Sequence, residues 1–229
     1  MTIRPETKSK IRAVLVGALA FASLSCAAPK MVDVVLLGGQ SNMEGCGVYD
    51  ELDEATKQRI ELASQRVRVS SDGRMPRGLS SKGWFRPDNS FGPELFLGLT
   101  LAEKYPDRDF LLIKTAIGGT TLSGAWSPDW SAERSRTVEM GEKQKEMKLY
   151  SQHLRGIKKR IRRLDRRGGH YRIMGMAWMQ GESDTMVETA AHSYEENLTN
   201  LIRSYRRDLE QPNLPFVFVQ VNNPIWIKQ

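Results

Sequence analysis

A serine at the end of an apolar segment is the first residue of this sequence that could do chemistry. Ser41 stands in the segment GGQSNME, whose two glycines follow the mostly aliphatic run 32–37. Such a run is typical of a buried parallel strand, and open α/β sheets place ligands and reactive groups beyond the carboxyl ends of their strands. Ser41 could therefore be a nucleophile. The alternative is that it caps a helix, because Ser and Asn are favoured cap residues.

Two further polar loops follow apolar runs in the same way, IGGT at 117–120 and QGESD at 180–184. A serine nucleophile needs a base that takes its proton and hydrogen-bond donors for the oxyanion that forms during acyl transfer. The N–H of Ser41, an N–H of Gly118 or Gly119, and the Gln180 amide would supply three donors. The three loops together therefore favour ester chemistry.

The chain must bring these loops to one place. Apolar and amphipathic periodicity predicts strands at 32–37, 66–70, 109–116, 171–179 and 214–221, and helices at 50–65, 91–105, 140–167 and 190–210. Strands that alternate with helices predict a mainly parallel sheet covered on both faces, in one α/β domain. Because the carboxyl ends of parallel strands share one edge of a sheet, the three loops should converge.

The motifs in these loops resemble those of a known family. GGQSNME, FGPE, AIGGTTL and WMQGESD together are similar to the sialate O-acetylesterase and acetylxylan esterase group of carbohydrate esterases, within the SGNH hydrolase superfamily. The similarity extends from about residue 32 to residue 221. It implies a three-layer α/β/α sandwich with a flavodoxin-like parallel sheet. It also implies a serine esterase that removes O-acetyl groups from a sugar or polysaccharide through an acetyl-serine intermediate.

The resemblance also implies roles for individual residues. Ser41 would be the nucleophile, Gly119 and Gln180 would stabilise the oxyanion, and Glu182 would order the third loop. The Ser-Asn-Met order differs from the GxSxG turn of ordinary α/β-hydrolases, which makes that class less suitable. The candidate substrate-binding residues are Gln40, Asn42, Glu182 and Trp126.

The base expected from the resemblance is missing from this sequence. Members of the group carry it in a DxxH motif beyond the last strand, whereas no such motif precedes Gln229. His153, His170 and His192 stand in other contexts, and we expect each to be a surface or packing residue. A serine without an imidazole base is a poor nucleophile near neutral pH.

Three hypotheses follow from this departure. The domain 29–229 is either a carbohydrate esterase domain that lacks its C-terminal catalytic Asp/His segment, with impaired activity, or a glycan-binding descendant without turnover. The third hypothesis is that Glu182 or Asp184 acts as the base through a water molecule. We favour the impaired esterase.

Two tryptophans lie in a loop without periodicity, at Trp126 and Trp130 in GAWSPDW. Bulky aromatic rings in a loop usually cover something. They could cap the hydrophobic core, or they could form a stacking wall for a sugar ring.

The first 28 residues have the pattern of a secretory signal. A basic segment precedes the apolar run 13–24 and the small-residue segment SCAAP, and this run is too short to span a bilayer. We expect residues 1–28 to be a signal peptide cleaved near Ala27 or Ala28, and the remaining chain to be exported to the periplasm or beyond. A lipid-modified Cys26 is the alternative.

Charge and composition limit the classes of partner and cofactor that we expect for this chain. The formal charge is +7, and the predicted signal contributes four basic residues and Glu6, which leaves +4. Two cysteines and three histidines predict neither a disulfide framework nor a metal site, and we expect no cofactor. The predicted helix 140–167 carries a basic face, which is either a nucleic-acid patch or a solvated surface. Because this helix has no interleaved aromatic pattern and we expect the chain to be exported, we favour the solvated surface. We expect an acetylated carbohydrate as partner, no nucleic acid and no stable membrane span, and we assign no oligomeric state.

Overall fold

A six-stranded sheet lies at the centre of the molecule. The computed structural model describes residues 31–80 and 89–220. The strands lie in the order β4-β3-β6-β1-β7-β8, and all neighbours are parallel except β4, which is antiparallel to β3. Their bounds are β1 Met31–Gly39, β3 Val67–Ser71, β4 Arg77–Gly78, β6 Asp109–Ala116, β7 His170–Met179 and β8 Phe216–Phe218. A separate short pair is formed by β2 Gly47–Val48 and β5 Ser90–Phe91.

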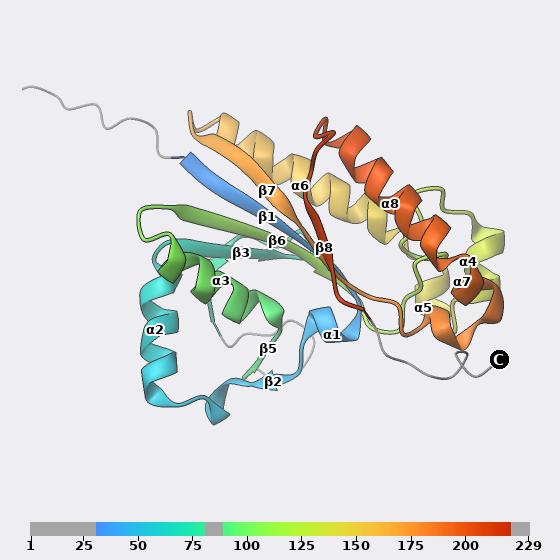
Figure 1. The fold of residues 1–229 in the computed structure, drawn as a ribbon, viewed down its shortest axis with the longest axis horizontal. Coiled ribbons are helices and arrows are strands. Elements are labelled where there is room, and N and C mark those ends of the chain that lie inside the picture. Colours follow the sequence, from blue (N-terminus) through green and yellow to red (C-terminus); the bar gives the residue numbers. More distant parts are fainter. Residues whose placement is uncertain (1–30, 81–88, 221–229) are drawn as a thin grey trace, which may run out of the picture.

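Helices cover both faces of this sheet (Figure 1). The longer helices are α2 Glu54–Ser64, α3 Pro93–Lys104, α6 Leu149–Asp165 and α8 Tyr194–Asp208. The shorter ones are α1 Ser41–Glu44, α4 Ala132–Val138, α5 Glu142–Lys145 and α7 Glu188–His192, with 3-10 turns η1 Tyr49–Glu51 and η2 Asp184–Met186. Helices α2 and α3 pack on one face and α6 and α8 on the other, so the predicted three-layer α/β/α fold is confirmed.

Each face of the sheet contributes to its own hydrophobic core. Val34 and Leu36 of β1 point toward α6 and α8, where they meet the fully buried Ile157. Val35 and Leu37 point the other way and pack with residues of α2 and α3 such as Leu95. Strand β1 is buried on both faces, as the five aliphatic residues among positions 32–37 predict.

The pairing of β1 with β7 contains one irregularity. Val34 pairs with Ile173, but Val35 pairs with Gly175, so Met174 is an extra residue in β7. A bulge of this kind places two successive residues of one strand opposite a single residue of its partner.

Two predicted helices are shorter than expected. The helix predicted from 140 to 167 begins only at Leu149, whose N–H donates to the carbonyl of Ala125 at 2.7 Å. Residues 140–148 contain only the short helix α5 instead. The helix predicted over 190–210 is two helices, α7 and α8, because helical geometry is interrupted at Ser193.

Local caps explain where the other helices begin. The Asp53 side chain accepts from the N–H of Thr56 at 2.8 Å, which caps α2. Helix α3 begins with Pro93 at its first position, where the missing N–H costs nothing.

Within the described residues, no helix is both long and apolar enough to cross a bilayer. The predicted signal peptide and part of the predicted loop 72–89 lie outside the described residues.

Candidate active site

Ser41 lies at the carboxyl edge of the sheet, as the first residue of α1 directly after β1. Its side chain is exposed, and its hydroxyl has no hydrogen-bond partner among residues 31–80 and 89–220. The tight entry to α1 depends on Gly39, because a Cβ there would collide with the carbonyl oxygen of Met179 on β7. An exposed hydroxyl at a constrained turn is well placed to react with a ligand.

The second loop, residues 117–120, lies against Ser41, as the sequence predicts. A Cβ built on Gly118 would be 3.4 Å from the Cβ of Ser41, so the two backbones are in close contact. The N–H of Gly118 donates to Glu44 Oε1 at 3.0 Å and is therefore occupied. Gly119 has φ +70° and is exposed, and its N–H has no acceptor in the described part of the chain. Of the two glycines, Gly119 is the one with a donor available to a substrate.

The third loop, residues 180–184, is connected to the first loop, residues 38–44, by side-chain hydrogen bonds. The Glu182 carboxylate accepts from the amide groups of both Gln40 and Asn42. The hydroxyl of Ser183 donates to Gln40 Oε1 at 2.8 Å. Gln40 is buried, so its predicted contact with substrate is not supported, and it serves to join two loops. Asn42 is exposed beside Ser41 and remains a candidate contact for a ligand.

The predicted role of Gln180 as an oxyanion donor is not supported by its geometry. Gln180 is buried, and its Nε2 donates to the carbonyl of Thr120 at 2.9 Å and to Asp184 Oδ2 at 2.6 Å. Both amide hydrogens are therefore used. The Tyr194 hydroxyl also donates to the Gln180 backbone carbonyl at 2.6 Å. Gln180 thus holds the second and third loops together instead of facing Ser41.

Asp184 anchors the same pair of loops from inside the protein. Its carboxylate has no exposed surface and accepts from the N–H groups of Leu122 at 2.8 Å and Ser123 at 3.3 Å, as well as from Gln180. Burial raises the pKa of Asp184 to about 6, although these donors oppose the shift. The final residue of the QGESD motif is therefore an internal anchor, a role that the sequence did not indicate.

A buried ion pair supports α1 from below. Lys114 of β6 donates to Glu94 Oε2 at 2.5 Å and to the backbone carbonyl of Glu44 at 3.0 Å. Glu94 also accepts from the N–H of Gly92 at 3.1 Å. Lys114 is 4% exposed and Glu94 13% exposed. The FGPE motif thus supplies the acid that fixes the cation beneath the end of α1.

A second buried acid organises the segment after the second loop. Glu139 Oε1 accepts from the N–H of Thr121 at 3.0 Å, the Thr121 hydroxyl at 2.8 Å and the N–H of Ala125 at 2.7 Å. Burial raises its pKa. Sequence reasoning missed Glu139, because a single acid near a helix end carries no recognisable motif.

Trp126 belongs to the core, which corrects its predicted place in the binding site. It has no exposed surface, and its ring lies edge-on to Trp178 with centroids 4.9 Å apart. A buried ring cannot stack on a sugar. Trp130 lies nearer the surface, and the Lys148 ammonium is 4.0 Å from the centroid of its ring.

None of the three histidines is placed to activate Ser41. His153 is fully buried on α6, between the Tyr205 hydroxyl at 2.8 Å and the Ile113 carbonyl at 3.2 Å, and burial lowers its pKa to about 4. His170 begins β7 and so lies at the opposite edge of the sheet. His192 is exposed on α7 and is bonded to the Glu188 carbonyl. The expectation of packing and surface histidines agrees with these positions.

The carboxylates near Ser41 are also committed elsewhere. Glu182 binds two amides and Asp184 is buried against backbone N–H groups, so neither matches the hypothesis of a base acting through water. The described residues contain no group of three or more His, Cys, Asp or Glu side chains that could hold a metal ion. The arrangement offers an exposed Ser41 hydroxyl, and on the adjacent loop the N–H of Gly119 has no acceptor within the described residues.

Comparisons with known proteins show the family and the fold of this chain. A family described as "Carbohydrate esterase, sialic acid-specific acetylesterase" matches residues 31–229. A relative from Arabidopsis thaliana, "Probable carbohydrate esterase At4g34215", is 41% identical over 49 residues, which cover 21% of this chain and only 19% of that protein.

Two solved structures share the fold. The crystal structure of the Arabidopsis thaliana protein AT4G34215 superposes with a TM-score of 0.60 at 20% identity, over 84% of this chain and 74% of that one. The crystal structure of NanS superposes with a TM-score of 0.54 at 16% identity, over 87% of this chain and 70% of that one.

Proposed function

Because the chain belongs to the carbohydrate esterase family of sialic acid-specific acetylesterases, we propose that it is a serine esterase that removes O-acetyl groups from a sugar or polysaccharide. The observation that carries this proposal is the exposed hydroxyl of Ser41, a residue whose Cα and Cβ lie against Gly118 of the second loop. The buried acids Asp184 and Glu139 and the Lys114–Glu94 pair hold the surrounding loops in place. Such preorganisation lowers the cost of stabilising charge at the moment of reaction.

The proposed reaction has two steps. Ser41 Oγ attacks the acetyl carbonyl carbon and loses its proton to a base, while the carbonyl oxygen becomes an oxyanion that the N–H groups of Ser41 and Gly119 can bind. The C–O bond to the sugar then breaks, and the sugar oxygen leaves with a proton. Water attacks the acetyl-serine in the same manner, which releases acetate and restores the hydroxyl.

We propose further that the chain with this sequence turns over slowly. No imidazole contacts Ser41 within the described residues, and the sequence contains no histidine after His192. Loss of the base from a serine triad removes several powers of ten in rate. The oxyanion donors and the substrate contacts would still give some acceleration over water.

The test is acetate release from 4-nitrophenyl acetate and from acetylated xylan, with the purified protein and with Ser41→Ala. We expect slow release by the parent chain and a further loss of at least about tenfold in the variant, since the covalent route is then closed. His170→Ala and His192→Ala are matched controls whose rates should equal the parent. Equal rates for the parent and Ser41→Ala would contradict Ser41 as the nucleophile.

A second candidate function is glycan binding without turnover. It is favoured by the occupied Gln180 amide, which leaves the site with fewer oxyanion donors than the sequence predicts. Calorimetric titration with acetylated xylo-oligosaccharides distinguishes the two functions. Binding without acetate release would favour this candidate over the esterase.

A further inference from the structure

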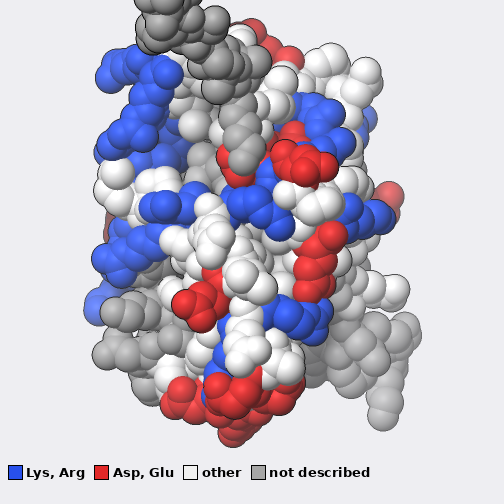
Figure 2. All heavy atoms as spheres, turned by 90° about the vertical axis from the view of Figure 1, so that its left-hand side faces the viewer, with Lys and Arg blue, Asp and Glu red and all other residues white. Residues whose placement is uncertain are grey.

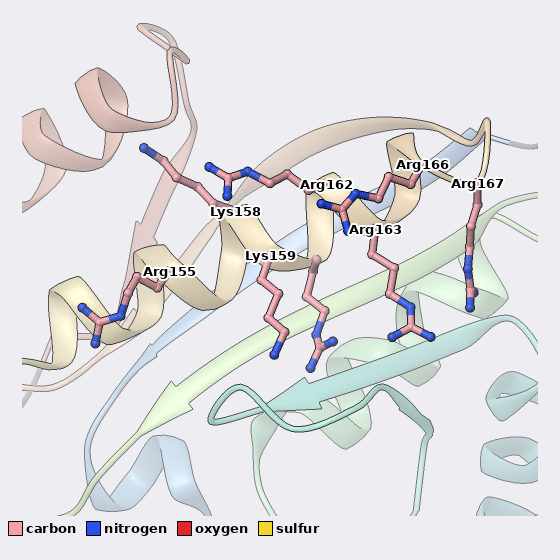
Figure 3. A pocket seen from close by; sticks show the side chains of 8 residues that line it. Arg155, Lys158, Lys159, Arg162, Arg163, Arg166 and Arg167 are labelled. Atoms are coloured by element: carbon pink, nitrogen blue, oxygen red, sulfur yellow. The ribbon is translucent and has the colours of Figure 1, made fainter.

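The outward face of α6, together with the two residues that follow it, carries a continuous stripe of cations, which we call the basic stripe. Its seven members recur at helical spacing of three and four residues, and all are exposed: Arg155, Lys158, Lys159, Arg162, Arg163, Arg166 and Arg167. Figure 3 shows Lys159, Arg163 and Arg167 extending to one side of the helix, and Lys158, Arg162 and Arg166 to the other. At 1.5 Å per residue, the stripe is about 18 Å long.

The cations of the basic stripe lack acidic partners. None of the seven forms an ion pair with a carboxylate among residues 31–80 and 89–220. Asp208 lies close enough to Lys158 to feel its charge, but Asp208 is bonded to Arg207 at 2.7 Å. Asp165 is the one acid within α6. Little protein charge therefore neutralises the stripe.

Arg160, on the same helix, shows the difference between a structural cation and these seven. Its guanidinium is buried and donates to Ser70 Oγ at 2.9 Å and to the carbonyls of Gly73 at 2.7 Å and Arg74 at 2.5 Å. It fixes the turn after β3. The basic stripe contributes no comparable set of bonds, so folding does not account for it.

The surface along the stripe is hollowed. An open depression of about 680 Å³ is lined by the stripe together with Arg160. A second depression of about 470 Å³ shares Arg163 and Arg167 with it and extends to Arg66 and Arg68, with Asp109 at its edge. Figure 2, which views the left-hand side of Figure 1, shows Lys and Arg gathered along one flank and Asp and Glu at the lower end. Clustered charge of one sign in a concave surface attracts counter-ions of the opposite sign.

The stripe suits a linear, flexible polyanion better than a base-reading partner. Like charges at i and i+4 repel, and a bound polyanion relieves this repulsion and releases counter-ions. No aromatic side chain lines the depression of 680 Å³, so single-stranded bases would find no stacking surface there. Family membership points to carbohydrate chemistry, and carboxylated polysaccharides are linear polyanions.

We propose that the basic stripe binds the backbone of a carboxylated polysaccharide, and that the acetylated polymer which the site acts on is therefore anionic. This rests on the proposed esterase function, since it names the class of polymer presented to Ser41. Helix α6 begins beside Ala125, in the segment that follows the second loop, and runs away from Ser41. The stripe is thus a surface distant from the reacting atoms that retains the polymer.

Retention is measured by affinity electrophoresis or calorimetry with sodium polygalacturonate, in a Ser41→Ala background so that turnover plays no part. The test variant is Lys158→Gln/Arg162→Gln/Arg166→Gln, and the matched control removes three exposed cations from elsewhere, Lys104→Gln/Arg134→Gln/Arg203→Gln. We expect the test variant to bind about tenfold more weakly, as the loss of three exposed ion contacts would give. The control should change binding less than about twofold, and added salt should weaken binding by the parent.

A kinetic arm uses acetylated polygalacturonate with Ser41 intact. The test variant should raise KM for this polymer, while its rate on 4-nitrophenyl acetate stays equal to the parent. Absence of acetate release would contradict the proposed esterase but leave the binding result to decide the stripe. Equal binding by the test and control variants would overturn the proposal, as would equal binding of neutral xylan. Tighter binding of duplex DNA or anionic vesicles, lost in the test variant, would also overturn it in favour of another polyanion.

Discussion

Charged residues are treated in opposite ways at the carboxyl edge of the sheet and on α6. Around Ser41, the acids Glu139 and Asp184 are buried and Glu94 is 13% exposed, and each accepts at least two hydrogen bonds. On α6 and directly after it, seven cations project into solvent without carboxylate partners among the described residues. The first region uses charge to fix geometry, and the second leaves charge available to a ligand.

This difference separates two kinds of evidence for function. Buried charges are costly unless paired, so their presence shows that a defined loop arrangement is maintained. Exposed unpaired charges contribute little to folding, so a regular stripe of them points outward to a partner. Substitutions in the two regions should therefore differ in size and in kind.

The largest effect is expected from the buried ion pair. Lys114→Met leaves the Glu94 carboxylate without its cation, and removing one partner of a buried pair costs about 3–5 kcal/mol of unfolding free energy. Urea denaturation measures this loss. The double variant Lys114→Met/Glu94→Leu should recover much of it, and a single-variant loss below about 1 kcal/mol would show that the pair is dispensable.

Asp184→Asn should have the next largest effect. The substitution removes a carboxylate that accepts from two backbone N–H groups and from Gln180, so we expect a loss of about 2–3 kcal/mol. Asp107→Asn, at an exposed acid, is the matched control and should stay within about 0.5 kcal/mol. Similar stabilities of the two variants would remove the anchoring role of Asp184.

The raised pKa of Asp184 also predicts how the stability of the protein depends on pH. The pKa of Asp184 is raised to about 6, so its contribution to stability is present below about pH 4 and lost as pH rises through 6. The pKa of His153 is lowered to about 4, so its contribution is present above about pH 6.5 and lost as pH falls toward 4. These contributions oppose each other between pH 4 and 6. Over that range, the stability of Asp184→Asn should rise with pH more steeply than that of the parent, as measured by urea titrations at several pH values.

The smallest effect is expected on α6. Arg162→Gln/Arg166→Gln removes two like charges at i,i+4, which should stabilise the protein by about 0.2–0.5 kcal/mol at low salt and by less at 1 M salt. Arg160→Gln on the same helix should instead destabilise it, because buried acceptors lose their donor. Thermal denaturation at two salt concentrations measures both. A marked destabilisation by the double variant would mean that the basic stripe has a structural role.

Much of the fold was predictable because its signal is local. The aliphatic run 32–37 marks the central strand, and the paired glycines after it and after 109–116 mark loops that do converge. The predicted start of α6 at residue 140 was wrong. Glu139 bonds to Ala125 and Thr121, 14 and 18 positions earlier, and this pairing holds the segment before Leu149 outside the helix. Such pairing between distant residues has no periodic signature.

The site was predictable by position more than by contact. Ser41, Gly118 and Gly119 lie together as expected, whereas Gln180 and Trp126 face inward. Loop position follows from topology, but the direction of a side chain depends on which acceptors surround it. For Gln180 those acceptors are the Thr120 carbonyl and Asp184, which no spacing in the sequence reveals.

Because of its bulge, β7 contains one residue more than its pairing with β1 requires, and the loop after β7 keeps its position. Ile173 and Met176 face the same core although they are three residues apart, because Met174 is the extra residue between them. Deleting Met174 would restore a regular ladder and leave Met176 and Trp178 on their present face. The length of β7 could therefore change by one residue at this point without moving the QGESD loop beyond it.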